Sequence, residues 1–193
     1  RLHNRKRLTG KSSVRLASET LAHLRATVLP HADQVAELLG VPPLGLELSV
    51  TKPAATRVHE LDAVVSGTSL DVSAWLAVLS LYLALPLSQD TVCTGAIEPA
   101  SDDLHPVQGL IEKLAAVRAM PSIRRFVCPP MDEDQSIGQL APLLRQRTTE
   151  AFQEAARDIE LVTARNLADV LRTCATEDGM VTAALCCGYF DQR

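Results

Sequence analysis

A single apolar run, VSAWLAVLSLYLALPL at residues 72–87, constrains the fold of this chain more than any other feature. It contains no charged side chain, so we expect it to be buried. At about 16 residues it is shorter than the roughly 20 residues that a helix needs to cross a bilayer, and no signal peptide is visible. The run therefore predicts a buried helix from about residue 69 to residue 85, ended by Pro86, and no membrane association.

The rest of the chain alternates helical and strand patterns around this helix. With 193 residues, 47% of them apolar, it can bury one substantial core. The first helical pattern should end at Pro30. The expected helices span residues 14–28, 31–40, 107–117, 136–157 and 164–175, and the expected strands span residues 44–50, 61–65, 91–98, 123–129 and 159–163. This order predicts an α/β (α+β) domain with two layers, a mixed sheet with helices packed on it.

These patterns also predict how the chain is divided. Residues 1–8 are rich in arginine and lysine and are expected to form a basic linker or tail. Residues 9–175 carry the alternating elements and should form one domain. Residues 176–193 are a C-terminal extension whose apolar side chains indicate burial. Because the first residue is Arg1 rather than methionine, we expect the chain to be a piece of a longer polypeptide.

The charge balance and the cysteines narrow the class of protein. A net charge of −4 and only 3% aromatic residues argue against a nucleic-acid partner. The five cysteines form no CxxC pair, so zinc is not expected. They are typical of reduced core thiols in an intracellular protein, and we expect a cytoplasmic location. No metal or cofactor is expected in this domain.

The stretch SGTSLD, residues 66–71, stands immediately before the apolar run. Ser69 would lie at the head of the buried helix, where backbone N–H groups could hold a developing oxyanion. The alternative is structural, because Thr68 and Asp71 have the spacing of a capping box. From these residues we expect a helix cap in a place that would also suit a nucleophile.

Three stretches in chain order resemble the proteolytic domain of Lon proteases. They are SGTSLD at residues 66–71, DTVCTGAIEP at residues 90–99, and HPVQGLIEKLAAVRAM at residues 105–120, followed by a strand ending in VCPP. The family patterns are close to DGPSAG, DVAMTGEI and LPIGGLKEKLLAA. The resemblance spans roughly residues 9–174 and implies the Lon-type fold, a serine and lysine pair, and an ATPase ring on the same chain or on a partner.

The departures from the family pattern concern the catalytic pair itself. The resemblance makes Ser69 the nucleophile position and Thr94 the threonine of TGEI, while Ile111 stands where the family has its catalytic lysine. Isoleucine cannot accept a proton. Lys113 is two residues further along, about 200° around a helix, so its side chain should face away from whatever Ile111 faces.

Other substitutions lie close to the serine position. Leu70 and Asp71 replace the family's Ala-Gly after the serine, where we expect them to crowd or repel a substrate carbonyl, and Ala96 replaces its acid. His105 is the candidate substitute base by residue type, because histidine titrates near neutral pH. No motif supports the other histidines, namely His3, His23, His31 and His59.

We therefore expect a degenerate Lon-type peptidase domain that is catalytically inactive and acts as an oligomerising or protein-binding module. Two alternatives stay open. One is an active serine endopeptidase that uses Ser69 with a substitute base, and the other is a binding scaffold unrelated to proteolysis. The resemblance implies a homo-oligomer, a polypeptide substrate or protein partner, and ATP only through an ATPase domain on the same chain or on a partner.

Overall fold

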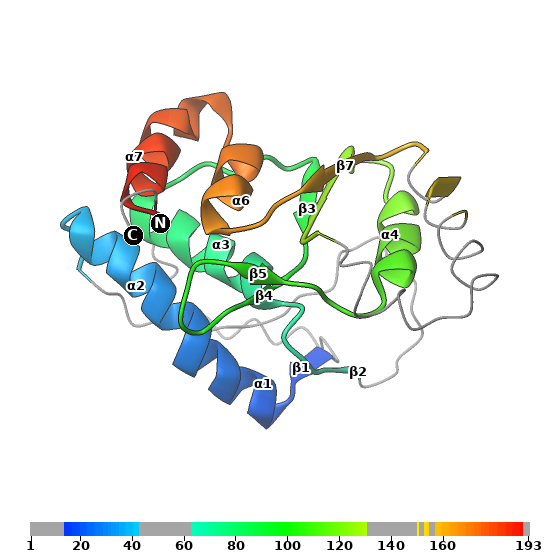
Figure 1. Cartoon of the computed structure of the whole chain (residues 1–193), viewed down its shortest axis with the longest axis horizontal. Coiled ribbons are helices and arrows are strands. Elements are labelled where there is room, and N and C mark those ends of the chain that lie inside the picture. The colour runs from blue at the N-terminus through cyan, green and yellow to red at the C-terminus, as the bar shows by residue number, and fades with distance from the viewer. Residues whose placement is uncertain (1–13, 43–62, 131–149, 151–152, 155–156, 191–193) are drawn as a thin grey trace.

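The computed structural model describes residues 14–42, 63–130, 150, 153–154 and 157–190 (Figure 1). Three sequence predictions lie outside the described residues: the basic tail at residues 1–8, the strand at residues 44–50, and most of the helix at residues 136–157. The described strands are β1 (Val14–Leu16), β2 (Ala63–Val65), β3 (Thr91–Cys93), β4 (Ala96–Ile97), β5 (Leu104–His105), β6 (Arg125–Cys128) and β7 (Glu160–Thr163). The helices are α1 (Ser18–His23), α2 (Leu29–Leu38), α3 (Asp71–Leu83), α4 (Leu110–Arg118), α6 (Leu167–Cys174) and α7 (Met180–Phe190), with the π-helical turn η1 (Leu24–Val28) and the 3₁₀ turn η3 (Glu177–Gly179).

The strands form three small sheets among these helices. Strands β3, β6 and β7 make a parallel sheet in that order, β4 pairs antiparallel with β5, and β1 pairs parallel with β2. The prediction of a mixed α/β fold is confirmed.

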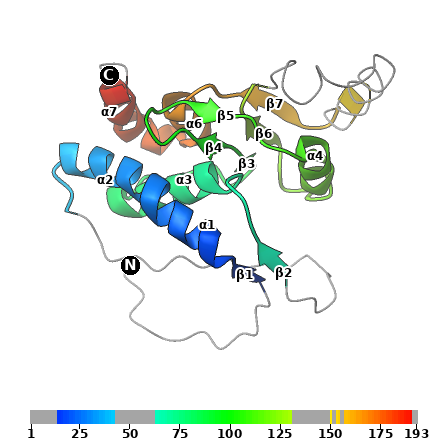
Figure 2. The ribbon, with the colours of Figure 1, turned by 60° about the horizontal axis from the view of Figure 1, so that its bottom comes forward.

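Helix α3 is the predicted buried helix and lies at the centre of the larger core. Trp75 and Leu79 are fully buried on it, and it packs against α2, η1 and α6 (Figures 1 and 2). The helix ends at Leu83, before Pro86, because Ala84 adopts a left-handed conformation at φ 48°. The Leu85 N–H then donates to the carbonyl of Ser80, a common way of closing a helix.

The N-terminal helix differs from its prediction at both ends. Val14 was predicted to be helical, but this is wrong: Val14 lies in β1, aligned with Ala63 of β2, a pairing that suits a β-branched residue. Pro30 was predicted to end the helix, and this is also wrong. The π-helical turn η1 comes directly before α2, which places Pro30 in the first turn of α2. A missing N–H is tolerated in a first turn.

A second, smaller core joins α4 to the parallel sheet. Leu114 and Val117 of α4 are buried against Phe126 of β6 and Ile159, which precedes β7. The two cores meet at the parallel sheet, since Val127 of β6 belongs to the larger core and Phe126 of β6 to the smaller one.

Helix α7 covers one end of the larger core. Its Ala183, Cys186 and Cys187 are buried, and the ring of Phe190 lies 6.1 Å from that of Trp75, centroid to centroid. The apolar part of the C-terminal extension is therefore packed on this core. None of the helices in the described part of the chain combines the length and hydrophobicity that a membrane crossing requires.

Candidate functional site

The head of α3 is held against the segment between β3 and β4. The hydroxyl of Thr94 donates to the carbonyl oxygen of Ser69 at 3.0 Å, and the N–H of Gly95 approaches the same oxygen at 3.4 Å. In return, the N–H of Val72 donates to the carbonyl of Gly95 at 3.3 Å. The two candidate residues Ser69 and Thr94 are thus brought together, through the backbone of Ser69 rather than through its hydroxyl.

Gly95 permits this close approach. A Cβ at this position would lie 2.8 Å from Cγ2 of Val72 and 3.3 Å from Cγ of Pro129. The first distance is shorter than a carbon–carbon contact allows. Only glycine therefore fits here without a shift of α3 or of the segment between β3 and β4.

Asp71 is the first residue of α3, and its side chain is fully buried. One carboxylate oxygen, Oδ2, accepts from the N–H of Ile97 at 3.2 Å and lies 2.8 Å from Nε2 of His23. The other, Oδ1, has no hydrogen-bond partner among the described residues. Burial raises the pKa of Asp71, and the hydrogen bonds from His23 and Ile97 oppose that shift.

This geometry shows that the capping-box prediction for SGTSLD was wrong. The helix has no side-chain cap, and its N-cap position is Leu70. The carboxylate of Asp71 points inward to β4 and α1 rather than back to the start of its own helix. Val72 N–H, which a cap would otherwise satisfy, is taken by the carbonyl of Gly95.

The sequence analysis did not identify His23 as part of this site, because the residue lies 48 positions from Asp71 and belongs to no motif. In the structure His23 lies beside Thr20 of α1 and Leu24 and Thr27 of η1, which are all buried. A histidine close to such a buried face is half-buried and needs a polar partner. The π-helical turn begins at the next residue, Leu24.

His105, the expected substitute base, lies on β5 opposite Ala96 of β4. Its side chain is 56% exposed and makes an ion-pair contact with the carboxylate of Glu98. The hydrogen bond from His105 lowers the pKa of Glu98. The described contacts therefore connect His105 to the β4–β5 hairpin and not to the hydroxyl of Ser69.

Ile111 and Lys113 both lie in the first turns of α4. Ile111 is half-buried, and the amine of Lys113 donates to the carbonyl of Gln108, just before the helix. Gly109 makes this entry possible because it adopts φ 69° at the N-cap. Among the described contacts, the amine of Lys113 bonds to Gln108 and not to Ser69, and the side chain of Ile111 has no polar atom with which to do so.

The chemistry available at the head of α3 is therefore limited. The hydroxyl of Ser69 is present, but no described group accepts a hydrogen bond from it, and the imidazole of His23 is bound to Asp71. A serine hydroxyl is a weak nucleophile without such a base. No cluster of three or more metal-ligating side chains occurs in the part of the chain that the structure describes.

No model of a known protein family matches this chain, and no curated protein matches its sequence.

Proposed function

We propose that this chain is a Lon-like proteolytic domain that has lost its catalytic base and acts as an oligomerising or protein-binding module. The observation that carries the proposal is the environment of Ser69. Its carbonyl is fixed by Thr94, its hydroxyl has no hydrogen bond to a described residue, and the resemblance aligns Ile111 with the lysine. Lys113, the nearby amine, is bound to Gln108 at the entry of its own helix.

The order of the motif segments supports the resemblance part of the proposal. The TGAI segment at residues 94–97 crosses the head of α3, and the chain then forms the β4–β5 hairpin and enters α4. A peptidase domain of this type would receive unfolded polypeptide from an ATPase domain, on the same chain or on a partner, in the cytoplasm. ATP would then act only in that neighbouring domain.

An active serine endopeptidase is the second candidate function, and the His23 pair favours it. An imidazole bound to a buried carboxylate is an arrangement found in acid–base catalysis, and here the carboxylate belongs to Asp71, two residues after Ser69. His23 ranks above His105 as the substitute base, because His105 is exposed and engaged with Glu98.

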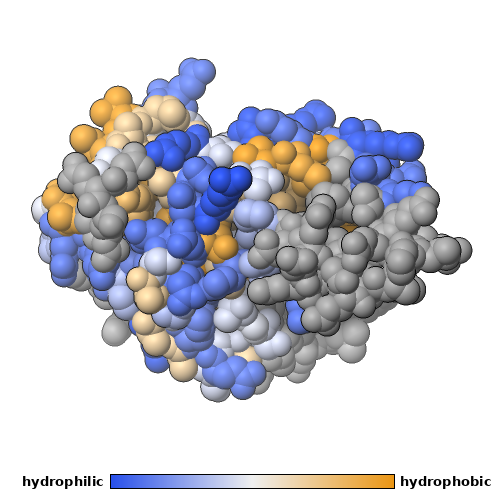
Figure 3. Space-filling model, in the orientation of Figure 1, coloured by the Kyte–Doolittle hydropathy of each residue, from blue (hydrophilic) through white to orange (hydrophobic). Residues whose placement is uncertain are grey.

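Exposed apolar side chains support the binding part of the proposal. Val181 and Leu185 of α7 are 74% and 61% exposed, one helical turn apart. Leu38, at the end of α2, is 58% exposed. Figure 3 shows hydrophobic surface gathered over α7. An apolar patch of this kind is typical of an interface, and we propose that it contacts a second copy of this chain.

Replacing Leu185 with glutamate tests this interface. We expect the unmodified chain to elute as an oligomer in light-scattering chromatography, and Leu185→Glu to shift it to the mass of the monomer. A charge placed in an apolar contact must be desolvated, which weakens association. Ala115→Glu is the matched control, because Ala115 is exposed on α4 and should leave the mass unchanged. A monomeric unmodified chain, or an unchanged mass for Leu185→Glu, would contradict the proposed interface.

A further inference from the structure

Both ring nitrogens of His31 face carbonyl oxygens. His31 lies in the first turn of α2 and is only 8% exposed. Its Nδ1 lies 2.7 Å from the carbonyl oxygen of Thr27, one turn earlier on η1, and its Nε2 lies 3.0 Å from the carbonyl oxygen of Ser101, 70 residues further along the chain. Ser101 belongs to the loop between β4 and β5. The side chain of His31 therefore joins α2 to the β4–β5 hairpin.

Only the charged form of His31 can make both contacts as hydrogen bonds. A carbonyl oxygen accepts hydrogen bonds and cannot donate them, so each of the two ring nitrogens needs its own proton. A neutral imidazole carries one N–H, and its other nitrogen would then face a carbonyl oxygen with a lone pair. The geometry therefore describes an imidazolium ion held between α2 and the hairpin.

The contact with Ser101 is the one that a neutral ring should lose. The contact with Thr27 is the shorter of the two, and it stays within one continuous helical stretch, formed by η1 and α2. The contact with Ser101 is longer and connects two separate elements. A ring that keeps its proton on Nδ1 places two acceptors, Nε2 and the Ser101 carbonyl, opposite each other. Because acceptors repel, the loop should then turn this carbonyl away.

The charged side chains on the helical stretch that carries His31 are exposed or engaged elsewhere. Arg25 of η1 and Glu37 of α2 are exposed. Asp33 of α2 accepts a hydrogen bond from the hydroxyl of Tyr82 on α3 at 2.6 Å. In the part of the chain that the structure describes, the ring of His31 contacts the two carbonyl oxygens and forms no ion pair. Its charge is therefore stabilised by backbone acceptors.

Helix α3 and the hairpin contribute the carboxylates on the other side. The one charged residue of α3 is Asp71, and it is engaged by His23. In the hairpin loop, Asp102 and Asp103 directly follow Ser101, and Asp103 accepts from the Ser101 hydroxyl at 3.1 Å. The charges that lie closest along the chain to the Ser101 carbonyl are therefore negative, which is the sign that favours an imidazolium over a neutral ring.

We propose that His31 is a pH-sensitive latch, which holds the β4–β5 hairpin to α2 while its ring is charged and releases the hairpin when Nε2 loses its proton. Histidine changes charge between about pH 5 and pH 8, so the contact with Ser101 should be complete at the acid end of this range and lost as the pH rises. The hairpin follows directly after the segment that contacts Ser69 at the head of α3. Release would therefore loosen the chain beside that position. This inference does not depend on the proposed function.

A pH titration followed by nuclear magnetic resonance tests the latch on the folded chain. The ring nitrogens of His31 report how many protons the ring carries, and the carbonyl carbon of Ser101 reports the contact. We expect two ring N–H groups at about pH 5 and one at about pH 8, and a change in the chemical shift of the Ser101 carbonyl with the same midpoint. A Ser101 carbonyl that stays constant while the ring titrates, or a ring whose proton count stays constant over this range, would overturn the proposal.

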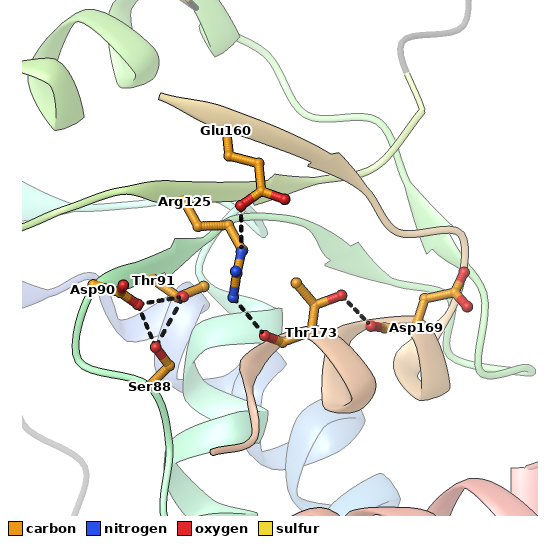
Figure 4. Close-up of polar contacts among 7 residues, drawn as sticks. All are labelled: Ser88, Asp90, Thr91, Arg125, Glu160, Asp169 and Thr173. Carbon is orange, nitrogen blue, oxygen red and sulfur yellow. Dashed lines mark hydrogen bonds and ion pairs between the residues drawn. The ribbon is translucent and has the colours of Figure 1, made fainter. Parts of the chain in front are cut away.

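Arg125 supplies an internal control, because its charge is permanent. Figure 4 shows its side chain between Glu160 of β7 and the end of α6, where Nη1 donates to the carbonyl of Thr173 at 3.3 Å. This contact also joins a charged side chain to a carbonyl, but a guanidinium keeps its proton throughout the titration. The Thr173 carbonyl should therefore keep its chemical shift. An equal change at Thr173 and Ser101 would show that the response is not specific to His31, and would contradict the latch.

Two variants assign the response to one histidine. The glutamine of His31→Gln has one donor nitrogen and no titrating proton, so the Ser101 carbonyl should no longer respond to pH. His105→Gln is the matched control, because His105 lies on the same hairpin and contacts Glu98, and it should leave the response unchanged. A response that survives in His31→Gln would overturn the proposal. The titration of the unmodified chain and of His105→Gln tests the latch even if His31→Gln fails to fold.

Discussion

Replacing Trp75 with alanine is expected to lower the free energy of unfolding by about 3–5 kcal/mol. Trp75 is fully buried in the middle of α3, and its ring contacts Phe190 of α7 at a tilt of 59°. The variant would lose the apolar surface of the ring and leave a cavity between α3 and α7. Urea unfolding followed by circular dichroism measures the change.

Leu81→Ala is the matched control for this substitution. Leu81 lies on the same helix, but it is 67% exposed, so the change in unfolding free energy should stay within about 0.5 kcal/mol. A loss below about 1 kcal/mol for Trp75→Ala would be far less than a buried aromatic contributes, and would contradict a core organised around α3.

Replacing Gly95 with alanine should lower the free energy of unfolding by about 1–3 kcal/mol, the usual cost of overpacking. The new Cβ would lie 2.8 Å from Cγ2 of Val72, a β-branched side chain that has few alternative rotamers on a helix. Either α3 or the segment at residues 94–97 must shift. The contact between Gly95 and the carbonyl of Ser69 should therefore be lost as well.

Gly188→Ala is the control for the glycine substitution. Gly188 lies within α7, and apart from its own helix no atom of the described residues lies within 4 Å of the position that a Cβ would take. Alanine should stabilise the helix there by roughly 0.5–1 kcal/mol. Equal unfolding free energies for the Gly95→Ala variant and the unmodified chain, measured by urea unfolding, would show that the head of α3 is not packed as tightly as described.

The buried helix was predictable from sequence because its signal is local. An uncharged apolar run must be buried wherever it lies in the fold, and α3 is buried as expected. The exact ends were less predictable. Ala84 ends α3 through its backbone conformation, and the π-helical turn before Pro30 allows the N-terminal helix to continue.

The site was only partly predictable, because its polar contacts join residues far apart in the chain. The resemblance singled out both Ser69 and Thr94, and a hydrogen bond of 3.0 Å from the Thr94 hydroxyl to the Ser69 carbonyl joins them in the structure. The spacing of Thr68 and Asp71 indicated a helix cap. In the structure the carboxylate of Asp71 is buried instead, with the imidazole of His23 and the N–H of Ile97 as its partners. A local pattern carries no information about such partners.

The central claim is that Ser69 has no base, and degradation of an unfolded, fluorescently labelled protein tests it most directly. The unmodified chain and Ser69→Ala are compared, after circular dichroism has shown that both are folded, with release of labelled fragments as the readout. We predict that neither releases fragments above the substrate-only background. Fragment release by the unmodified chain that disappears in Ser69→Ala would contradict the claim and would identify an active endopeptidase, with His23 as the first residue to examine as its base.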